Sequence, residues 1–273
     1  MSFYKETDGQ IIREYKLETS YTQKKSEKAL IELVPTKEFG PTLFLDNVLQ
    51  FAQKDEYIYH EMLVHPCVSS SKKREHICIL GGGDGCAARE VLKWSEVKQI
   101  DLYDWDKDIT DSFLKENAWL NMWSLQSPLV QIHTHDIRSL VEKTYSYDCI
   151  IVDLLDPDDS QDELWQDIFQ CLEKWIRPGG SIVINAGGIL PWKTESFNWL
   201  LQQLQPPPSF ERHLYKVFVP SFGKEWCFVL LNEAKKITLG SLPNGLDYID
   251  DVAWSQAYTY GWTKNYQKVL QGI

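Results

Sequence analysis

The feature that most constrains the fold of this chain is a regular alternation of short apolar segments with helical segments. The apolar segments have the length of buried strands and lie at residues 77–80, 100–105, 129–136, 149–157 and 181–187. Between them, apolar residues recur at helical spacing in residues 87–94, 108–120 and 162–176. Because strands that alternate with helices form a parallel sheet with helices on both faces, the sequence predicts an α/β fold with a doubly wound sheet.

The downstream end of the chain departs from this pattern. Residues 214–222 and 225–233 are two further apolar segments joined by a short turn at Gly223, which predicts an antiparallel pair at the sheet edge. This ending is typical of adenosylmethionine-dependent transferases rather than of dinucleotide oxidoreductases. The predicted sheet is therefore Rossmann-like and of the transferase type.

The upstream end predicts a second, smaller unit. Short apolar runs at residues 29–34 and 41–47 alternate with polar residues and indicate an antiparallel β-unit. A segment with helical spacing follows and ends at Pro66. We therefore expect a small N-terminal β domain with its linking helix in residues 1–65 and a Rossmann-like catalytic domain in residues 66–273.

Composition argues against several classes of function. The chain has 28 basic and 39 acidic residues, a net charge of −11, which disfavours nucleic acid and anionic membranes and suits cationic ligands. The six cysteines form no Cys-x-x-Cys pair, so we expect no metal site and no disulfide framework, and we expect a reducing compartment, the cytoplasm. We find neither a signal-peptide pattern nor an apolar run of membrane-spanning length, so we expect no membrane contact.

The first candidate site is the glycine turn that follows residues 77–80. Gly81, Gly82 and Gly83 allow the backbone to approach a ligand at the carboxyl edge of the sheet, although a glycine-rich turn alone is a weak signal. Two aspartates strengthen it, because Asp104 and Asp136 end the next two strands at the same edge. Asp104 can hold ribose hydroxyls and Asp136 can accept from an adenine amino group, whereas their alternative role is helix capping. Together these residues indicate a nucleoside pocket.

Asp84, within the same turn, separates the possible ligands. In a methyltransferase this region receives the amino acid end of adenosylmethionine, and a carboxylate there would repel the carboxylate of the ligand. If the ligand lacks its carboxyl group, Asp84 meets a bare ammonium and the contact is attractive. Asp84 therefore favours decarboxylated S-adenosylmethionine.

The second candidate site lies at the end of the fourth strand, where Asp153 and Asp156 precede Pro157. The proline favours a defined turn, which lets both carboxylates face one cavity. An aliphatic amine has a pKa of about 10, so it arrives protonated and needs a base before it can attack a sulfonium. The alternative is an ordinary acidic turn.

On the linking helix, Tyr59 can offer an aromatic wall to methylene groups and His60 can donate to a ligand, although each alone is more often core or surface.

These features together resemble the polyamine aminopropyltransferases, the spermidine synthase family. The resemblance covers about residues 15–235 and is carried by the motifs FLDNVLQ (44–50), DEYIYHEMLVHP (55–66), GGGDGCAAREVLKW (81–94), YDWD (103–106), HTHD (133–136), IIVDLLDP (150–157) and VPSF (219–222). It implies aminopropyl transfer from decarboxylated S-adenosylmethionine to a small-molecule polyamine acceptor, with release of 5'-methylthioadenosine and no permanently bound cofactor. It also implies a homodimer or homotetramer.

The resemblance implies a role for each matching residue. At the acceptor end, Asp153 resembles the base, Asp156 an anchor for the amine and Tyr59 a substrate-lining residue. At the donor end, the family's pattern places His60 and Asp84 at the aminopropyl-sulfonium group, Asp104 at the ribose and Asp136 at the adenine, with Gln50 in a supporting role.

Several positions depart from the family pattern. Asp104 replaces the usual glutamate, and an early glutamine falls on Ala29, which leaves Gln23 as a candidate replacement. The gate after Pro157 lacks the usual Gly-Pro and contains Asp158 and Asp159. Phe222 replaces a tyrosine that is frequent in members that use putrescine, a change that is similar to the thermospermine synthase branch and suggests a longer acceptor, spermidine.

Two alternatives remain open from the sequence. One is an S-adenosylmethionine-dependent methyltransferase on the same sheet, against which Asp84 argues. The other is a non-catalytic family member that binds a polyamine or nucleoside, against which the pair of Asp153 and Asp156 argues.

Overall fold

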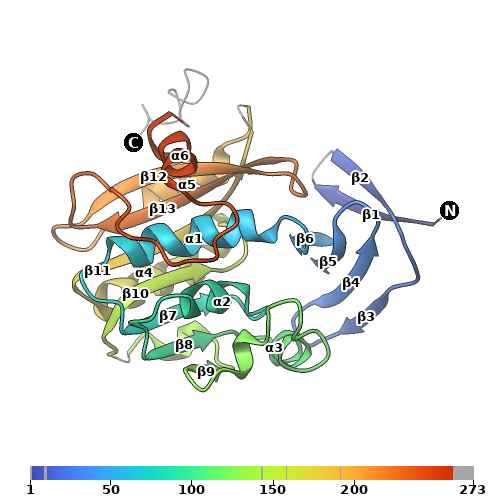
Figure 1. The fold of residues 1–273 in the computed structure, drawn as a ribbon, viewed down its shortest axis with the longest axis horizontal. Coiled ribbons are helices and arrows are strands. Elements are labelled where there is room, and N and C mark those ends of the chain that lie inside the picture. Colours follow the sequence, from blue (N-terminus) through green and yellow to red (C-terminus); the bar gives the residue numbers. More distant parts are fainter. Residues whose placement is uncertain (1, 9–10, 143, 158, 191, 261–273) are drawn as a thin grey trace.

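The computed structural model describes residues 2–8, 11–142, 144–157, 159–190 and 192–260. Its main element is a seven-stranded sheet with the order β12-β13-β11-β10-β7-β8-β9 (Figure 1). The strands from β11 to β9 in this order pair in parallel, and β13 and β12 add in antiparallel orientation at one edge. The strands are β7 (His76–Gly81), β8 (Gln99–Tyr103), β9 (Val130–His133), β10 (Tyr147–Asp153), β11 (Ile176–Ile189), β12 (Glu211–Val219) and β13 (Lys224–Asn232). The predicted doubly wound sheet with its antiparallel edge pair is confirmed.

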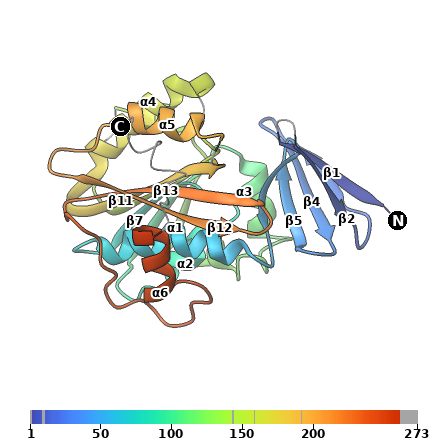
Figure 2. The same ribbon diagram turned by 90° about the horizontal axis from the view of Figure 1, so that it is seen from above.

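Helices cover both faces of the sheet, with α4 and α5 on one face and α1, α2 and α6 on the other (Figure 2). The α-helices are α1 (Glu56–Ser70), α2 (Cys86–Leu92), α3 (Lys107–Leu114), α4 (Asp162–Trp175), α5 (Glu195–Gln203) and α6 (Asp251–Trp254). Shorter helical turns are η1 (Ser124–Gln126), η2 (Ile137–Leu140), η3 (Asp159–Gln161) and η4 (Ser255–Tyr260). In the described part of the chain, no helix combines the length and apolar character needed to cross a membrane.

The strands are continuous apolar runs because both of their faces are buried. In β10, Cys149 and Ile151 pack into the cluster on the α1 side, whereas Ile150 and Val152 pack into the cluster on the α4 side. The polar Asp153 follows directly at the end of this strand. Burial of the strand therefore fixes where the polar residue emerges, at the carboxyl edge of the sheet.

The N-terminal part forms two small antiparallel sheets beside the main sheet (Figure 1). They contain β1 (Phe3–Asp8) and β2 (Ile11–Lys16) in one sheet, and β3 (Thr22–Lys25), β4 (Leu30–Thr36), β5 (Gly40–Leu45) and β6 (Val48–Ala52) in the other. The buried carboxylate of Glu6 joins them, because it accepts from the Tyr15 hydroxyl at 2.6 Å and from the Leu49 N–H at 3.2 Å. The predicted antiparallel β-unit is confirmed.

The prediction that the linking helix ends at Pro66 is wrong, because α1 continues through Pro66 to Ser70. A proline inside a helix has no N–H to donate to the carbonyl four residues earlier, which here is that of Met62. The hydroxyl of Tyr215 on β12 donates to this carbonyl instead, at 2.8 Å. A tertiary contact thus satisfies the backbone group that the proline leaves open. The predicted domain boundary between residues 65 and 66 falls inside α1 and stays a prediction.

Candidate active site

The glycine turn brings the ends of β7 and its neighbours into close contact. Gly81 has a φ of 82°, and a Cβ atom on it would lie 2.1 Å from the carbonyl oxygen of Asp153. A Cβ atom on Gly83 would lie 2.5 Å from Oδ2 of Asp104. Side chains at these two positions would therefore push apart the strand ends that carry the candidate carboxylates.

Asp104 is held against the glycine turn by two backbone donors. Its carboxylate accepts from the N–H of Gly83 at 3.0 Å and from the N–H of Asp106 at 2.8 Å. Burial raises the pKa of Asp104 to about 6. The two hydrogen bonds favour the ionised form and oppose this rise. In the same turn, the half-buried Asp84 accepts from the N–H of Cys86 at 2.7 Å. Two of the three carboxylates predicted for the donor end, Asp104 and Asp84, thus lie at the turn.

Asp136 follows β9 but is engaged locally. It accepts from the backbone N–H of Arg138 at 3.0 Å, and its carboxylate pairs with the guanidinium of Arg138. This pair lowers the pKa of Asp136. An adenine amino group would therefore have to share this carboxylate with an arginine that the sequence analysis did not consider.

The predicted acceptor-end residues Tyr59 and Asp153 lie in contact although 94 positions separate them. The Tyr59 hydroxyl donates to Oδ1 of Asp153 at 2.7 Å, while Oδ2 lies beside Gly82. Burial raises the pKa of Asp153 to about 6, with opposition from His60 and the Tyr59 hydrogen bond and reinforcement from Asp84. Burial and Asp153 also raise the pKa of Tyr59 far above its usual range, so its hydroxyl remains a donor.

Asp156 lies on the exposed loop after β10 and reaches back to β11. A Cβ atom on Gly187 would lie 3.3 Å from Cγ of Asp156, so the glycine leaves room for this carboxylate. The loop is fixed by Asn185, whose side-chain amide donates to the carbonyl of Leu154 at 2.8 Å. Asp158 of the predicted gate lies outside the described residues.

Aromatic rings form a wall next to Tyr59. The centroids of Phe222 and Trp226 each lie 6.1 Å from the Tyr59 centroid, and they lie 4.3 Å from each other. The indole N–H of Trp226 donates to Oδ1 of Asn185 at 2.7 Å, which fixes the ring. No role for Asn185 or Trp226 was predicted from the sequence, because both lie outside the motifs that carry the resemblance.

His60 is fixed by a buried ion pair that the sequence analysis did not find. Its Nδ1 lies 2.7 Å from the Glu56 carboxylate, and Arg89 donates twice to Glu56, at 2.7 and 2.9 Å. Burial alone would lower the pKa of His60, but Glu56 outweighs burial and, with Asp84 and Asp153, raises it to about 9. The available signal was the spacing of Glu56 and His60, which are four residues apart on one helix.

The same region contains a group of possible metal ligands. Ligand atoms of Glu56, His60 and Cys86 lie within 4.8 Å of one another. However, both Glu56 oxygens already accept from Arg89, and a metal ion here would stand next to a guanidinium cation. This geometry fits an ion pair better than a metal site. The prediction that the protein uses no metal stays a prediction.

Gln50 and Gln23 lie in the small N-terminal sheet. Gln50, on β6, is half-buried and donates to the Val48 carbonyl at 3.1 Å, and Gln23 is exposed on β3. The loop that follows β3 approaches the segment after β8, because the Ser26 hydroxyl donates to Asp106 at 2.6 Å. The roles predicted for the two glutamines stay predictions.

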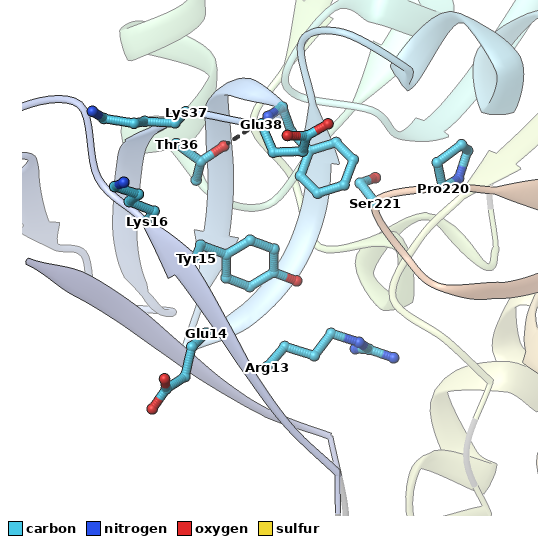
Figure 3. Close-up of a pocket in the computed structure, with 10 residues that line it drawn as sticks. Arg13, Glu14, Tyr15, Lys16, Thr36, Lys37, Glu38, Pro220 and Ser221 are labelled. Carbon is cyan, nitrogen blue, oxygen red and sulfur yellow. Dashed lines mark hydrogen bonds between the residues drawn. The ribbon is translucent and has the colours of Figure 1, made fainter.

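A separate hollow of about 420 Å³ lies between the N-terminal sheets and the β12–β13 turn (Figure 3). It is lined by Arg13, Glu14, Tyr15, Lys16, Thr36, Lys37, Glu38, Phe39, Pro220 and Ser221. Figure 3 shows the side chain of Arg13 extending towards Pro220 and Ser221. The lining mixes both signs of charge and includes no predicted site residue, so we do not assign the donor to this hollow.

The known proteins that are similar to this chain point to one family. Residues 56–240 match the family model described as spermine/spermidine synthase domain. The polyamine aminopropyltransferase of Pyrobaculum aerophilum is 31% identical over 224 residues, which are 79% of this chain and 76% of that protein. The thermospermine synthase of Arabidopsis thaliana is 30% identical over 242 residues, 85% of this chain and 70% of that protein. For the polyamine aminopropyltransferases of Korarchaeum cryptofilum and Oceanobacillus iheyensis, the match spans only 62% and 41% of the relative's length.

Solved structures confirm the predicted fold, a Rossmann-like sheet of the transferase type with a small N-terminal β region. The crystal structure of spermidine synthase from Thermotoga maritima matches with a TM-score of 0.84 at 19% identity and covers 100% of this chain and 95% of that one. A spermidine synthase in complex with the transition state analogue AdoDATO matches with a TM-score of 0.88 at 19% identity, covering 100% and 96%. The family model and the relatives together show that this chain belongs to the spermine/spermidine synthase family.

Proposed function

We propose that this protein transfers the aminopropyl group of decarboxylated S-adenosylmethionine to an amine nitrogen of a polyamine in polyamine biosynthesis. The observation that carries the proposal is Asp153, a half-buried carboxylate at the carboxyl end of a central strand. One of its oxygens is held by Tyr59 and the other lies beside the glycine turn. Its raised pKa, about 6, makes it a stronger base than an exposed aspartate while it remains mostly ionised at pH 7.

The reaction follows from this placement. The ammonium of the acceptor binds next to Asp153 and gives up a proton to it, because a protonated nitrogen has no electron pair for attack. The nitrogen then bonds to the methylene carbon next to the sulfonium as the carbon–sulfur bond breaks. The electron pair of that bond passes to sulfur, so 5'-methylthioadenosine leaves as a neutral thioether. Tyr59, Phe222 and Trp226 provide apolar surface for the methylene groups of the acceptor.

The donor is chosen by charge. Asp84 lies in the glycine turn, and its negative charge raises the pKa of both Asp153 and His60. A carboxylate at this place attracts the ammonium of decarboxylated S-adenosylmethionine and repels the carboxylate of the intact molecule. The charge of Asp84 thus separates the proposed activity from the methyltransferase alternative.

The acceptor is putrescine or a longer amine such as spermidine. Support for spermidine comes from Phe222, which offers a ring without a hydroxyl group, and from the likeness to the Arabidopsis thermospermine synthase. Asp158 and Asp159, which follow Pro157 in the sequence, are candidates to meet the extra ammonium groups. Turnover of putrescine without any turnover of spermidine would contradict this choice of acceptor.

Mass spectrometry of the products tests the function. The protein is incubated with decarboxylated S-adenosylmethionine and either putrescine or spermidine, and in parallel with intact S-adenosylmethionine. We expect aminopropylated amine and 5'-methylthioadenosine only from the decarboxylated donor. Asp153→Asn should lower the rate by about 10²- to 10⁴-fold, as removal of a general base does. Asp251→Asn, an exposed change on α6, is the control that should leave the rate unchanged. Methylated product, or binding without turnover, would overturn the proposal.

The expectations of a homodimer or homotetramer, a cytoplasmic location and no permanently bound cofactor stay predictions. Sedimentation velocity of the purified protein measures the first, and absorbance and mass spectra of the protein as isolated measure the last.

A further inference from the structure

The hydrogen bonds of His60 determine which of its ring nitrogens carries a hydrogen. Nδ1 lies 2.9 Å from the carbonyl oxygen of Glu56 and 2.7 Å from its carboxylate. Both partners are acceptors, so Nδ1 must be protonated in every state of the ring. Among the described residues, Nε2 has no hydrogen-bond partner. Any proton that His60 gains or loses is therefore carried by Nε2.

Glu56 is itself held in place from a second helix. Arg89 on α2 donates to both Glu56 oxygens, and its Nε donates to Glu90 at 2.8 Å. Glu90 also pairs with Lys93 at 2.7 Å. Glu56, Arg89 and Glu90 are buried, so a rotation of Glu56 would leave a buried guanidinium unpaired. This ion-pair network keeps the imidazole of His60 in one orientation.

The charge around His60 is negative when no ligand is bound. The titratable groups that face the ring are Glu56 and Tyr59 from α1, Cys86 from α2, Asp84 from the glycine turn and Asp153 from β10. Tyr59 and Cys86 remain neutral because burial raises the pKa of each far above its usual range. Arg89 compensates the charge of Glu56, so Asp84 and Asp153 are the carboxylates left to attract a cation. A protonated His60 supplies that cation in the free protein.

We propose that His60 releases its Nε2 proton when the cationic donor binds and that Nε2 then accepts a hydrogen bond from the donor's terminal ammonium. This proposal rests on the proposed function. The donor brings a sulfonium and an ammonium to the carboxylates Asp84 and Asp153, which until then stabilise the imidazolium. An imidazolium and the two cationic groups of the donor would together place three positive charges beside these two carboxylates, at high cost, because like charges in a buried site repel strongly. The released proton goes to the solvent, and Glu56 acts as a positioning residue that keeps the hydrogen on Nδ1.

Proton release can be measured without turnover. Decarboxylated S-adenosylmethionine is titrated into the protein by calorimetry, with no amine present, at pH 8 in phosphate, HEPES and Tris. These buffers differ in ionisation enthalpy, so the slope of the observed heat against that enthalpy counts the protons released. With a pKa of about 9, free His60 holds about 0.9 of a proton at pH 8. Asp153 and Asp104, with pKa values of about 6, each hold only about 1% of one at this pH.

We expect the release of most of one proton per donor bound. The matched control ligand is 5'-methylthioadenosine, which has the nucleoside but no ammonium chain and no sulfonium, and it should release close to none. His60→Asn keeps a donor near Glu56 but cannot titrate, so it should bind the donor more weakly and release no proton. Glu56→Gln removes the charge that keeps His60 protonated, so it should at least halve the release.

Three results would overturn the inference: donor binding without release in the wild-type protein, equal release with 5'-methylthioadenosine, or undiminished release in His60→Asn. If the donor does not bind at all, the proposed function fails, which is a different result. Should His60→Asn not fold, ¹⁵N NMR of the wild-type imidazole at pH 8 decides the question. We expect the His60 signals to change from imidazolium to the neutral form with hydrogen on Nδ1 when the donor binds, and an unchanged imidazolium would refute the proposal.

Discussion

Replacement of Tyr59 by phenylalanine removes one hydroxyl group and, with it, the 2.7 Å hydrogen bond to Asp153. This bond stabilises the ionised carboxylate, so its loss raises the pKa of Asp153 further above about 6. A hydrogen bond to a charged group contributes about 1.5–3 kcal/mol, and each pKa unit corresponds to about 1.4 kcal/mol. The pKa of Asp153 should therefore rise by about one to two units in Tyr59→Phe.

The assay is the pH dependence of kcat/KM for the acceptor, because this parameter reports the ionisation of the enzyme form to which the acceptor binds. The base must be ionised to act, so the acid limb of the profile follows the pKa of Asp153. We expect that limb to move to higher pH by about one to two units in Tyr59→Phe. Tyr57→Phe, a half-buried change on the same helix, should leave the limb in place. An acid limb that stays or moves to lower pH in Tyr59→Phe would refute the reasoning.

Four further changes test other contacts. Tyr215→Phe leaves the Met62 carbonyl unpaired and should lower the free energy of unfolding in urea by about 1–3 kcal/mol; an unchanged midpoint would contradict the account of Pro66. Gly81→Ala places a methyl group against the Asp153 carbonyl, so it should abolish stabilisation of the protein by 5'-methylthioadenosine in a thermal-shift assay, whereas retained stabilisation would contradict the close packing of this turn. Asp84→Asn should weaken binding of decarboxylated S-adenosylmethionine and shift the acid limb to lower pH; a shift to higher pH would contradict it. The lowered pKa of Glu90, about 2, adds stability that is fully present above its unfolded pKa of about 4.5 and is lost as the pH falls towards 2. Glu90→Gln should therefore flatten the loss of stability between pH 4.5 and 2, and an equally steep loss would show that Glu90 is not responsible.

The fold was predictable where burial alone decides the structure. Strand β10 is apolar on both faces and ends at a polar residue, and the sequence shows this directly as an apolar run followed by Asp153. The end of α1 was not predictable, because the residue that compensates Pro66 is Tyr215, which lies on another element far along the chain. Local propensity cannot report a partner that only the tertiary structure supplies.

The site was predictable to a similar degree. The rule that parallel strands end at one edge correctly brought Asp104 and the glycine turn together, and the structure joins them through the Gly83 N–H. The pairing of Asp136 with Arg138 was not predictable, because a strand-end position does not reveal what else a carboxylate binds. The role of Arg89 was not predictable either, because Arg89 acts on His60 through Glu56.

The opposite shifts expected from Tyr59→Phe and Asp84→Asn follow from a conflict within the site. A base that removes a proton from an amine must be basic, but a pocket that attracts cations lowers the pKa of its own carboxylates once they bind. Burial and Asp84 raise the basicity of Asp153, whereas His60 and the Tyr59 hydroxyl reduce it. When the donor's ammonium binds at Asp84, Asp84 raises the pKa of Asp153 less than before. Loss of the His60 proton would at the same time remove a positive charge that lowers this pKa. The two changes offset each other, so proton release from His60 would keep Asp153 basic in the presence of the donor, at the step where the acceptor amine must be deprotonated.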